Sequence, residues 1–382
     1  MKILIVIDSL ASGGAQKLKL ELARGLVKKG HKVELFIYDS NYQFFESEFI
    51  KAGIKIHISE RKSLGFSLKV LIELRSLIKV GKYDGIISSL QAPSIYAAFS
   101  KIGIRGPKLI VCEESSSKAP VSFFRKLFFY LATIIADYVV ANSFAEAKEL
   151  KKLPLRSRKI KTIWNGLDLN LIPFNPNFCV SEENIKNLLV IGRVAYPKNG
   201  LNIMKALKLF LKRNGWAPNL NWVGRRDIDS RSLKDKKTGN LQKEMDEFLN
   251  GNPDVASLWN WLGNVDDIFK QYKQADALLA PSLYEGLPVV LCEAMLTGCF
   301  VIASDVCDHP LLIDEGNRGL LCDPLSPESI CQAIESLNNM KVETRNETIN
   351  EARKFAENNF NIKKMVSSYE FLLNKKLDIL IN

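Results

Sequence analysis

Residues 2–30, KILIVIDSLASGGAQKLKLELARGLVKKG, decide the fold class. The run Lys2–Ile7, apolar after its first residue, predicts a buried β-strand, and the glycines of Ser12-Gly13-Gly14 predict the turn after it. Helical spacing predicts a helix over Ala15–Lys29, which Gly30 ends. Its apolar face is made by three leucines spaced four residues apart: Leu18, Leu22 and Leu26. A strand, a glycine turn and a helix are the repeating unit of a doubly wound α/β sheet.

The alternation of strands and helices continues along both halves of the chain. The strands expected in the first half are Lys2–Ile7, Lys32–Tyr38, Ile54–Ile58, Gly85–Ser88, Lys108–Cys112, Tyr138–Ala141 and Lys159–Ile163. Those expected in the second half are Asn187–Ile191, Asn219–Val223, Val255–Trp259, Ala277–Ala280, Val301–Ala303 and Gly319–Cys322. We therefore expect an α/β protein with two doubly wound, Rossmann-like domains and a ligand-binding cleft between the carboxyl ends of their sheets.

A Pro- and Asn-rich passage separates the two halves. Ile172-Pro173-Phe174-Asn175-Pro176-Asn177 continues neither a helix nor a central strand, so the boundary is placed there. The domains expected are 1–172 and 173–361. Residues 362–382 are expected to form a terminal helix that packs back on the N-terminal domain.

Composition limits the class of protein. The 382 residues are 47% hydrophobic and 25% charged, which excludes disordered and collagen-like chains. Seven cysteines without a Cys-x-x-Cys pair indicate neither a disulfide framework nor a zinc ribbon. The longest nearly apolar stretch, Leu127–Ala136, is too short to span a bilayer, which takes roughly 20 residues. A cytoplasmic protein is expected.

Charge is distributed unevenly between the halves. The whole chain carries +11, but residues 1–170 hold 28 Lys and Arg against 15 Asp and Glu, a net charge of +13. A basic domain indicates an anionic partner such as nucleic acid, acidic lipid or a phosphorylated substrate. Solvated surface lysine is the alternative.

Two positions have the residue types that bind phosphate. Gly13 and Gly14 precede a helix, whose free N–H groups attract anions, although a simple tight turn uses the same glycines. In the second half, Gly192-Arg193 follows a strand and Lys198 lies near a helix start. An Arg that contacts two oxygens and a Lys point charge suit a diphosphate, although exposed cations in loops are common.

The most specific stretch is Ala280–Ala294, APSLYEGLPVVLCEA. Glu285 lies in the loop after a buried strand, and Glu293 lies in the next helix. A carboxylate accepts two hydroxyl hydrogen bonds, as a ribose or hexose diol requires, and loop N–H groups can bind further oxygens. Alternatively, Glu285 starts a helix and Glu293 is a surface residue. Apolar neighbours make an unpaired Glu293 costly, which favours the functional interpretation.

These motifs together resemble those of the retaining GT-B glycosyltransferases of family four, over nearly the whole chain. The order is Gly13-Gly14-Ala15, Asn165-Gly166-Leu167-Asp168, Gly192-Arg193 with Lys198, Trp261-Leu262-Gly263-Asn264-Val265, and Glu285 with Glu293 eight positions later. The last pair, in its Glu-Gly-Leu-Pro context, is the most specific.

The resemblance implies that domain 1–172 binds the acceptor and domain 173–361 binds the nucleotide sugar, and it gives each matching position a role. Arg193 and Lys198 would bind the donor diphosphate, and Gly13 and Gly14 would contribute from the N-terminal domain. Val265 would face the base and Glu293 would hold the ribose. Glu285 and the backbone of Gly286, Leu287 and Pro288 would hold the donor sugar. No metal or other cofactor is expected, because two side-chain cations supply positive charge.

One position departs from the family pattern. Many relatives have a His after the strand that corresponds to Lys108–Cys112, whereas this chain has Glu113-Glu114. Glu114 is the candidate for that place and would accept a donor or acceptor hydroxyl. The alternative is that Glu114 pairs with a Lys or Arg.

Two further segments have features of a binding site. Asp227-Ile228-Asp229 has the form of an Asp-x-Asp metal motif but lies in a charged loop, so we expect no metal there. Val121–Ile135 is aromatic and apolar with Arg125-Lys126 inside it. It is either a buried helix or a segment that rests on anionic lipid.

The expected function is transfer of a hexose or N-acetylhexosamine from a UDP- or GDP-sugar to a glycan or polyprenyl-diphosphate-linked acceptor. This chemistry belongs to cell-surface polysaccharide synthesis, such as lipopolysaccharide or capsule. Peripheral contact with the inner face of the plasma membrane is expected, and no nucleic-acid partner. The alternatives are a basic nucleic-acid-binding protein and a membrane-docked scaffold without transferase activity.

Overall fold

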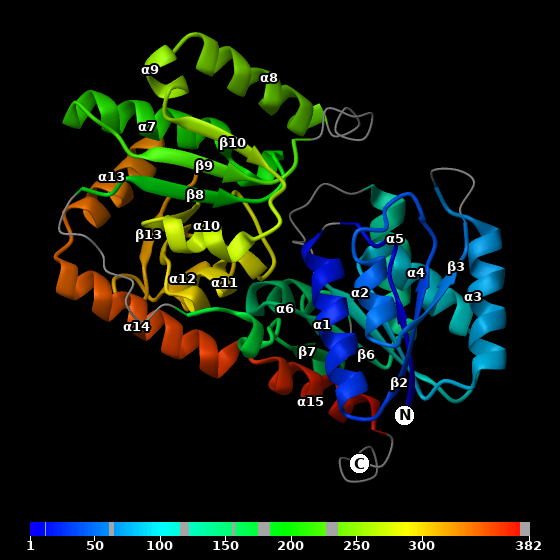
Figure 1. The fold of residues 1–382 in the computed structure, drawn as a ribbon. Helices are drawn as coiled ribbons and strands as arrows, with labels where there is room; N and C mark the ends of the chain where they lie inside the picture. The colour runs from blue at the N-terminus through cyan, green and yellow to red at the C-terminus, as the bar shows by residue number, and fades with distance from the viewer. Residues whose placement is uncertain are drawn as a thin grey trace. The chain divides into compact units, whose positions relative to one another are not determined.

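The chain folds into two compact units. The computed structural model describes residues 1–11, 13–60, 65–114, 122–154, 157–174, 184–226 and 236–374. The first unit joins Met1–Asp168 to Asn359–Asn382, and the second is Leu169–Asn358. Each contains one parallel sheet with helices on both faces (Figure 1). The predicted α/β class with two Rossmann-like sheets is confirmed.

The first unit has a seven-stranded sheet in the order β3-β2-β1-β4-β5-β6-β7. Its strands are β1 (Lys2–Val6), β2 (Lys32–Ile37), β3 (Lys55–Ile58), β4 (Gly85–Ser89), β5 (Lys108–Glu113), β6 (Tyr138–Ala141) and β7 (Ile160–Thr162). Its helices are α1 (Gly14–Lys28), α2 (Glu46–Lys51), α3 (Leu68–Gly81), α4 (Gln91–Lys101), α5 (Phe123–Ile135), α6 (Phe144–Leu150) and α15 (Ile362–Leu373).

Alternating side chains of the first sheet build two cores. Ile3 and Ile5 face a core that contains α1 and α15, whereas Leu4 and Val6 face a core that contains α3, α4 and α5. Period-two alternation in a strand covered on both faces gives this arrangement.

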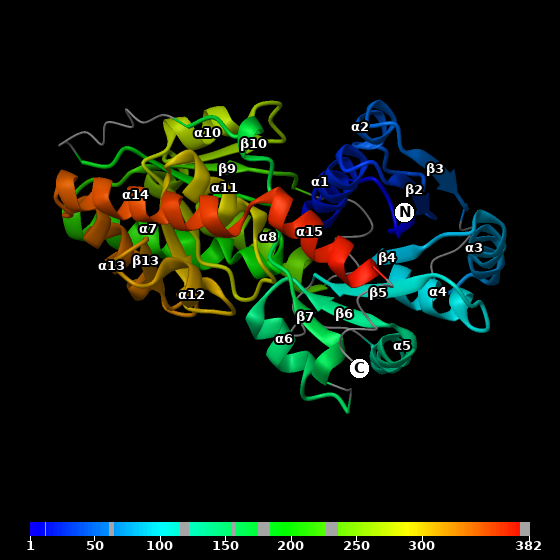
Figure 2. The same cartoon turned by 90° about the horizontal axis from the view of Figure 1, so that it is seen from below.

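Helix α15 packs across the strands and against α1 (Figure 2). The close packing of α15 on α1 depends on glycine at position 25. A Cβ added to Gly25 would lie 2.4 Å from Val366 Cγ2 of α15.

The second unit has a six-stranded sheet in the order β10-β9-β8-β11-β12-β13. Its strands are β8 (Asn187–Ile191), β9 (Asn219–Val223), β10 (Trp259–Gly263), β11 (Ala277–Ala280), β12 (Phe300–Ser304) and β13 (Leu320–Cys322). Its helices are α7 (Gly200–Asn214), α8 (Lys236–Asn250), α9 (Pro253–Ala256), α10 (Ile268–Gln274), α11 (Val289–Thr297), α12 (His309–Ile313), α13 (Pro327–Asn338) and α14 (Val342–Asn359). Helices α7, α8 and α13 cover one face of this sheet, and α10 and α11 the other.

One predicted strand is misplaced. Val255–Trp259 was expected to be a strand, but the structure has α9 over Pro253–Ala256 and β10 over Trp259–Gly263. Pro253 at the first helical position favours a helix start there. Trp259 and Trp261 then pack their rings with Trp222, which fixes the strand later in the sequence.

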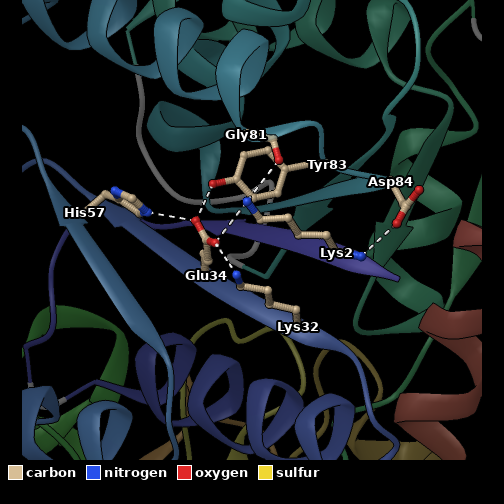
Figure 3. Close-up of polar contacts among 7 residues, drawn as sticks. All are labelled: Lys2, Lys32, Glu34, His57, Gly81, Tyr83 and Asp84. Atoms are coloured by element: carbon tan, nitrogen blue, oxygen red, sulfur yellow. Dashed lines mark hydrogen bonds and ion pairs between the residues drawn. The ribbon is translucent and has the colours of Figure 1, made fainter.

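A buried carboxylate, that of Glu34, lies near the amino ends of the strands in the first unit, and both of its oxygens have hydrogen-bond or ion-pair partners (Figure 3). Glu34 on β2 accepts hydrogen bonds from Tyr83 Oη at 2.6 Å and from His57 Nε2 at 2.9 Å. Its other oxygen lies 3.0 Å from Lys2 Nζ. Burial alone would raise the pKa of the Glu34 carboxyl, but the hydrogen bonds from Tyr83, His57 and Lys2 lower it to about 2.

Replacing Glu34 with Gln is expected to lower the free energy of unfolding by about 3 kcal/mol, because Tyr83 and Lys2 lose a charged acceptor. Because the folded pKa lies below the ordinary value of 4.5, this stabilisation is complete above pH 4.5 and is lost as the pH falls toward 2. Urea unfolding measures both effects. The control is Glu73→Gln in the exposed Lys69–Glu73 pair of α3, expected to cost under about 0.5 kcal/mol. Equal effects of the two substitutions would contradict the interpretation.

Candidate functional site

The candidate site of the second unit lies where β8, β11 and β12 end. These strands are neighbours in the sheet, so the loops after their carboxyl ends lie at one edge. The loop after β8 carries Gly192 and Arg193, the loop after β11 carries Glu285, and the loop after β12 leads to His309.

Lys198 lies directly against Gly192. Gly192 has φ +146°, and an added Cβ would lie 2.7 Å from Lys198 Cε. Gly224, after β9, has φ +138°, and a Cβ there would lie 2.2 Å from the Gly192 carbonyl oxygen. Glycine is therefore needed at both positions, and the close approach fixes where the Lys198 side chain runs.

Lys198 and Glu285 form an ion pair. Lys198 Nζ lies 2.6 Å from Glu285 Oε1, with the two side chains 22% and 19% exposed. Ser282 Oγ donates to the same oxygen at 2.9 Å. Burial alone would raise the pKa of the Glu285 carboxyl, but the charge and the hydrogen bond of Lys198 lower it, so Glu285 is ionised. The structure thus brings together Lys198, to which the family resemblance gives the diphosphate, and Glu285, to which it gives the donor sugar.

Glu293 is a buried residue of α11, and the surface alternative for it is excluded. It is 3% exposed. Tyr272 Oη, on α10, lies 3.1 Å from Glu293 Oε2 and equally close to the Val290 carbonyl oxygen. Burial and the charge of Glu293 raise the pKa of the Tyr272 hydroxyl, which therefore stays protonated and can donate to the carboxylate.

The other predicted residues of the second unit have varied exposure. Arg193 is exposed, and Val265 is half-buried in the loop after β10. Gly286 is half-buried, whereas Leu287 and Pro288 are buried. The roles given to these residues stay predictions.

His309 is a site residue that the sequence analysis missed. Its side chain is fully buried. Its Nδ1 lies 3.0 Å from the Ser304 carbonyl oxygen, which can only accept, so Nδ1 carries the proton. Ser304 Oγ donates to the Ser282 carbonyl oxygen at 2.7 Å. His309 is thereby linked through Ser304 and Ser282 to Glu285, and only the fold reveals this link.

The first unit places its predicted residues at the start of α1 and the end of β5. Gly13 is the N-cap of α1 in an extended conformation. Glu114 follows β5, and its Oε1 lies 2.5 Å from Lys19 Nζ on α1, with the two side chains 5% and 3% exposed. One carboxylate oxygen of Glu114 therefore forms the ion pair with a lysine that was the alternative to ligand binding. Whether Gly13, Gly14 and Glu114 face the same ligand as Lys198 and Glu285 stays a prediction.

Neither a metal cluster nor a membrane-spanning helix is found in the described parts of the chain. These residues contain no group of three or more His, Cys, Asp or Glu that could hold a metal ion. None of their helices is both long and apolar enough to cross a bilayer. Asp227-Ile228-Asp229 lies outside the described residues.

Comparison with known proteins gives matches over most of the chain. Residues 12–171 match the model of Glycosyltransferase Family 4, and residues 185–339 match that of Glycosyl transferases group 1.

Two curated relatives resemble the chain over most of its length. The Campylobacter jejuni GalNAc-α-(1→4)-GalNAc-α-(1→3)-diNAcBac-PP-undecaprenol α-1,4-N-acetyl-D-galactosaminyltransferase is 26% identical, with 85% of each chain covered. The Escherichia coli UDP-Gal:α-D-GlcNAc-diphosphoundecaprenol α-1,3-galactosyltransferase is 24% identical, with 84% of this chain and 82% of that protein covered.

A solved structure shares the fold over nearly the full length. Anabaena Alr3699/HepE, in complex with UDP and glucose, superposes with a TM-score of 0.82 at 19% identity. The match covers 98% of this chain and 99% of that one. This similarity shows the fold.

His309 gives a prediction about pH. Burial lowers the pKa of its imidazole, although the charges of Glu285 and Asp308 oppose this and that of Lys198 adds to it. Burial keeps His309 neutral in the folded chain, whereas in the unfolded chain it takes up a proton below its ordinary pKa of 6.5. The free energy of unfolding should therefore fall below pH 6.5 by about 1 kcal/mol per pH unit. Urea unfolding between pH 7.5 and 5.5 measures this slope. In His309→Asn, whose amide can still donate to Ser304, the slope should be smaller by that amount, and an unchanged slope would contradict the assignment.

Proposed function

The chain belongs to the GT-B glycosyltransferases of family four, and we propose that it transfers a hexose or N-acetylhexosamine from a nucleotide diphosphate sugar to a glycan or polyprenyl-diphosphate-linked acceptor. The observation that carries the proposal is the Lys198–Glu285 ion pair at the carboxyl edge of the second sheet. A diphosphate would require a cation and a sugar diol would require a carboxylate, and this pair supplies both groups. The name of the Escherichia coli relative supports a donor based on UDP, with GDP also allowed, and the names of both relatives support an acceptor linked to undecaprenyl diphosphate.

Donor binding would exchange the partners of this ion pair. The diphosphate would draw Lys198 away from Glu285, and Glu285 would accept hydroxyls of the sugar instead. Arg193, exposed after β8, would add a second cation, and buried Glu293 would accept the ribose hydroxyls. Ser282 holds Glu285 in place during the exchange, because its Oγ donates to the carboxylate at 2.9 Å.

The transfer step would depend on the same two cations. The bond from the anomeric carbon to the diphosphate oxygen breaks, a bond to an acceptor hydroxyl oxygen forms, and the hydroxyl proton passes to the leaving diphosphate, with the configuration retained. Negative charge develops on the leaving diphosphate, which Lys198 and Arg193 stabilise without a metal. The Gly13 and Gly14 backbone at the start of α1 would contribute from the first unit.

The test of this function is sugar transfer or hydrolysis across a panel of UDP- and GDP-hexoses and N-acetylhexosamines. At least one donor should be turned over, and Lys198→Met should lower kcat about 100-fold or more, because the leaving charge loses its cation. The matched control is Lys243→Met, which removes an exposed lysine of α8 and should leave kcat unchanged. The alternative of a nucleic-acid-binding protein predicts no turnover and steeply salt-dependent binding to nucleic acid.

Peripheral membrane contact is part of the proposal, and α5 supports it. Phe123 and Phe124 are 74% and 69% exposed, and Leu127, Phe128 and Ile134 are also exposed. Arg125 and Lys126 lie among them, and the helix has no acidic residue. Aromatic side chains beside cations, on a helix too short to span a bilayer, suit the surface of an anionic membrane.

The double variant Phe123→Ser, Phe124→Ser should bind vesicles of phosphatidylglycerol and phosphatidylethanolamine about tenfold more weakly than the wild type, because two exposed rings no longer enter the lipid. Cosedimentation measures the bound fraction. Phe371→Ser is the control, since Phe371 is 51% exposed on α15, which covers the other face of the sheet. Unchanged binding by the double variant would exclude α5 as the contact.

A further inference from the structure

A pocket of about 680 Å³ lies at the amino edge of the second sheet. It is lined by residues 184–186, which lead into β8, and by residues 216–219, which lead from α7 into β9. We call it the amino-edge pocket. Small-molecule sites have volumes of about 300–1,000 Å³, so a ligand has room there. Lys198 and Glu285 lie at the opposite, carboxyl edge of the same sheet, and the proposed transfer step makes no use of this pocket.

Trp216 gives the pocket an aromatic wall that is held in place. The ring is half-buried and packs against the core of the second unit. Its centroid lies 5.2 Å from that of Phe210, edge to face at 81°. The indole N–H makes no hydrogen bond within the part of the chain that the structure describes. A fixed apolar ring with an unused donor is typical of tryptophan at a binding surface.

Two asparagine side chains line the pocket together with this ring. Asn184 Oδ1 accepts from Asn338 Nδ2 at 3.3 Å, which leaves the Asn184 amide nitrogen as a donor. Asn219 is exposed, and its amide has no partner among the described residues, so it can both donate and accept. The pocket therefore offers several unused polar groups beside one aromatic ring.

The backbone around the pocket is fixed by hydrogen bonds. Asn219 N donates to the Lys186 carbonyl oxygen at 2.8 Å, which joins the two lining segments. Ile185 N donates to Asn338 Oδ1 at 3.1 Å, and Lys186 N donates to Asp276 Oδ2 at 2.7 Å. Because the frame is already ordered, a ligand would bind without the free-energy cost of ordering a loop.

The chemistry of the lining selects the class of ligand. Among the described residues that line the pocket, Lys186 is the one charged residue, and none is an Asp, Glu, His or Cys that would bind a metal. Nucleic acid requires a track of cations beside the aromatic ring, which a single lysine does not provide. Amides that donate and accept match the hydroxyls of a sugar, and the C–H face of a pyranose ring is apolar enough to pack on an indole. An uncharged sugar therefore fits this lining better than a metal or a nucleic acid.

We propose that the amino-edge pocket binds one or two residues of a glycan, with Trp216 as the stacking surface and the amides of Asn184 and Asn219 as hydrogen-bond partners. The proposal rests on the proposed function for the source of that glycan, which is the saccharide chain that the enzyme extends. The pocket would hold this chain away from the end that reacts and so retain it between transfers.

The experiment is saturation-transfer NMR of the full chain with N,N′-diacetylchitobiose and with lactose, with no nucleotide present. The wild type should bind at least one of them. Trp216→Leu and Asn219→Ala should each weaken that binding about fivefold or more, because one loses the stacking surface and the other a hydrogen-bond partner. Asn219→Ala should leave the thermal unfolding midpoint unchanged, since the amide is exposed and has no partner among the described residues. Asn219→Ala therefore decides the outcome if Trp216→Leu, which also loses packing on Phe210, does not fold.

Asn260→Ala is the matched control. Asn260 is an exposed asparagine of β10 whose Nδ2 donates to Asn221 Oδ1 at 3.0 Å, and it lies outside the lining of the pocket. This variant should bind the disaccharide like the wild type. Wild-type binding by Asn219→Ala, equal loss in Asn260→Ala, or no binding of either disaccharide by the wild type would overturn the proposal. Binding of adenosine that depends on Trp216, in place of the disaccharides, would overturn it as well, because the pocket would then be a site for an aromatic base.

The outcome is separate from that of the proposed function. Disaccharide binding is measured without a donor, so a chain that turns over a nucleotide sugar but binds neither disaccharide refutes the amino-edge pocket alone. Conversely, disaccharide binding that depends on Asn219, in a chain that turns over no nucleotide sugar, supports the pocket and refutes the transferase.

Discussion

The contact between Lys198 and Glu285 is the interaction on which the account of the second unit depends. Two partly buried charges 2.6 Å apart stabilise each other, and each is also the group that one part of an activated sugar would need. The pair is held from several sides: Gly192 leaves room for the lysine, Ser282 binds the carboxylate, and Ser304 and His309 anchor the neighbouring strand end. Under the proposed function, a donor would therefore exchange the partners of a charged pair that already exists.

The amino edges of the two sheets show different uses of polar groups. In the first unit, Glu34 has donors on both oxygens, and such a carboxylate stabilises the fold. In the second unit, Trp216 and Asn219 line a pocket with polar groups that have no partner in the described residues. Groups whose hydrogen bonds are made within the chain are expected to serve stability, and unused groups beside a pocket are expected to meet a ligand.

Most of the fold could be predicted from the sequence, because strand and helix periodicity repeat along the chain. It failed at β10, where tryptophan packing on Trp222 outweighed local pattern. Glu293 was predicted because its apolar neighbours make a carboxylate conspicuous, and Glu285 because it lies in the loop after a buried strand, in a Glu-Gly-Leu-Pro context. His309 could not be found in that way, since the burial of a lone His depends on tertiary contacts. Trp216 and Asn219 could not be found either, because only the pairing of β8 with β9 brings them to one pocket with Asn184. For Glu114 the sequence left pairing and ligand binding open, and the structure supplies the Lys19 pair.

The most direct test of the central claim is a crystal structure of the chain with an intact nucleotide sugar from the panel. The account predicts that Lys198 Nζ leaves Glu285 and contacts the diphosphate, that Glu285 accepts hydroxyls of the sugar, and that Glu293 accepts those of the ribose. A nucleotide sugar bound elsewhere, or bound here with the Lys198–Glu285 pair still intact, would contradict it.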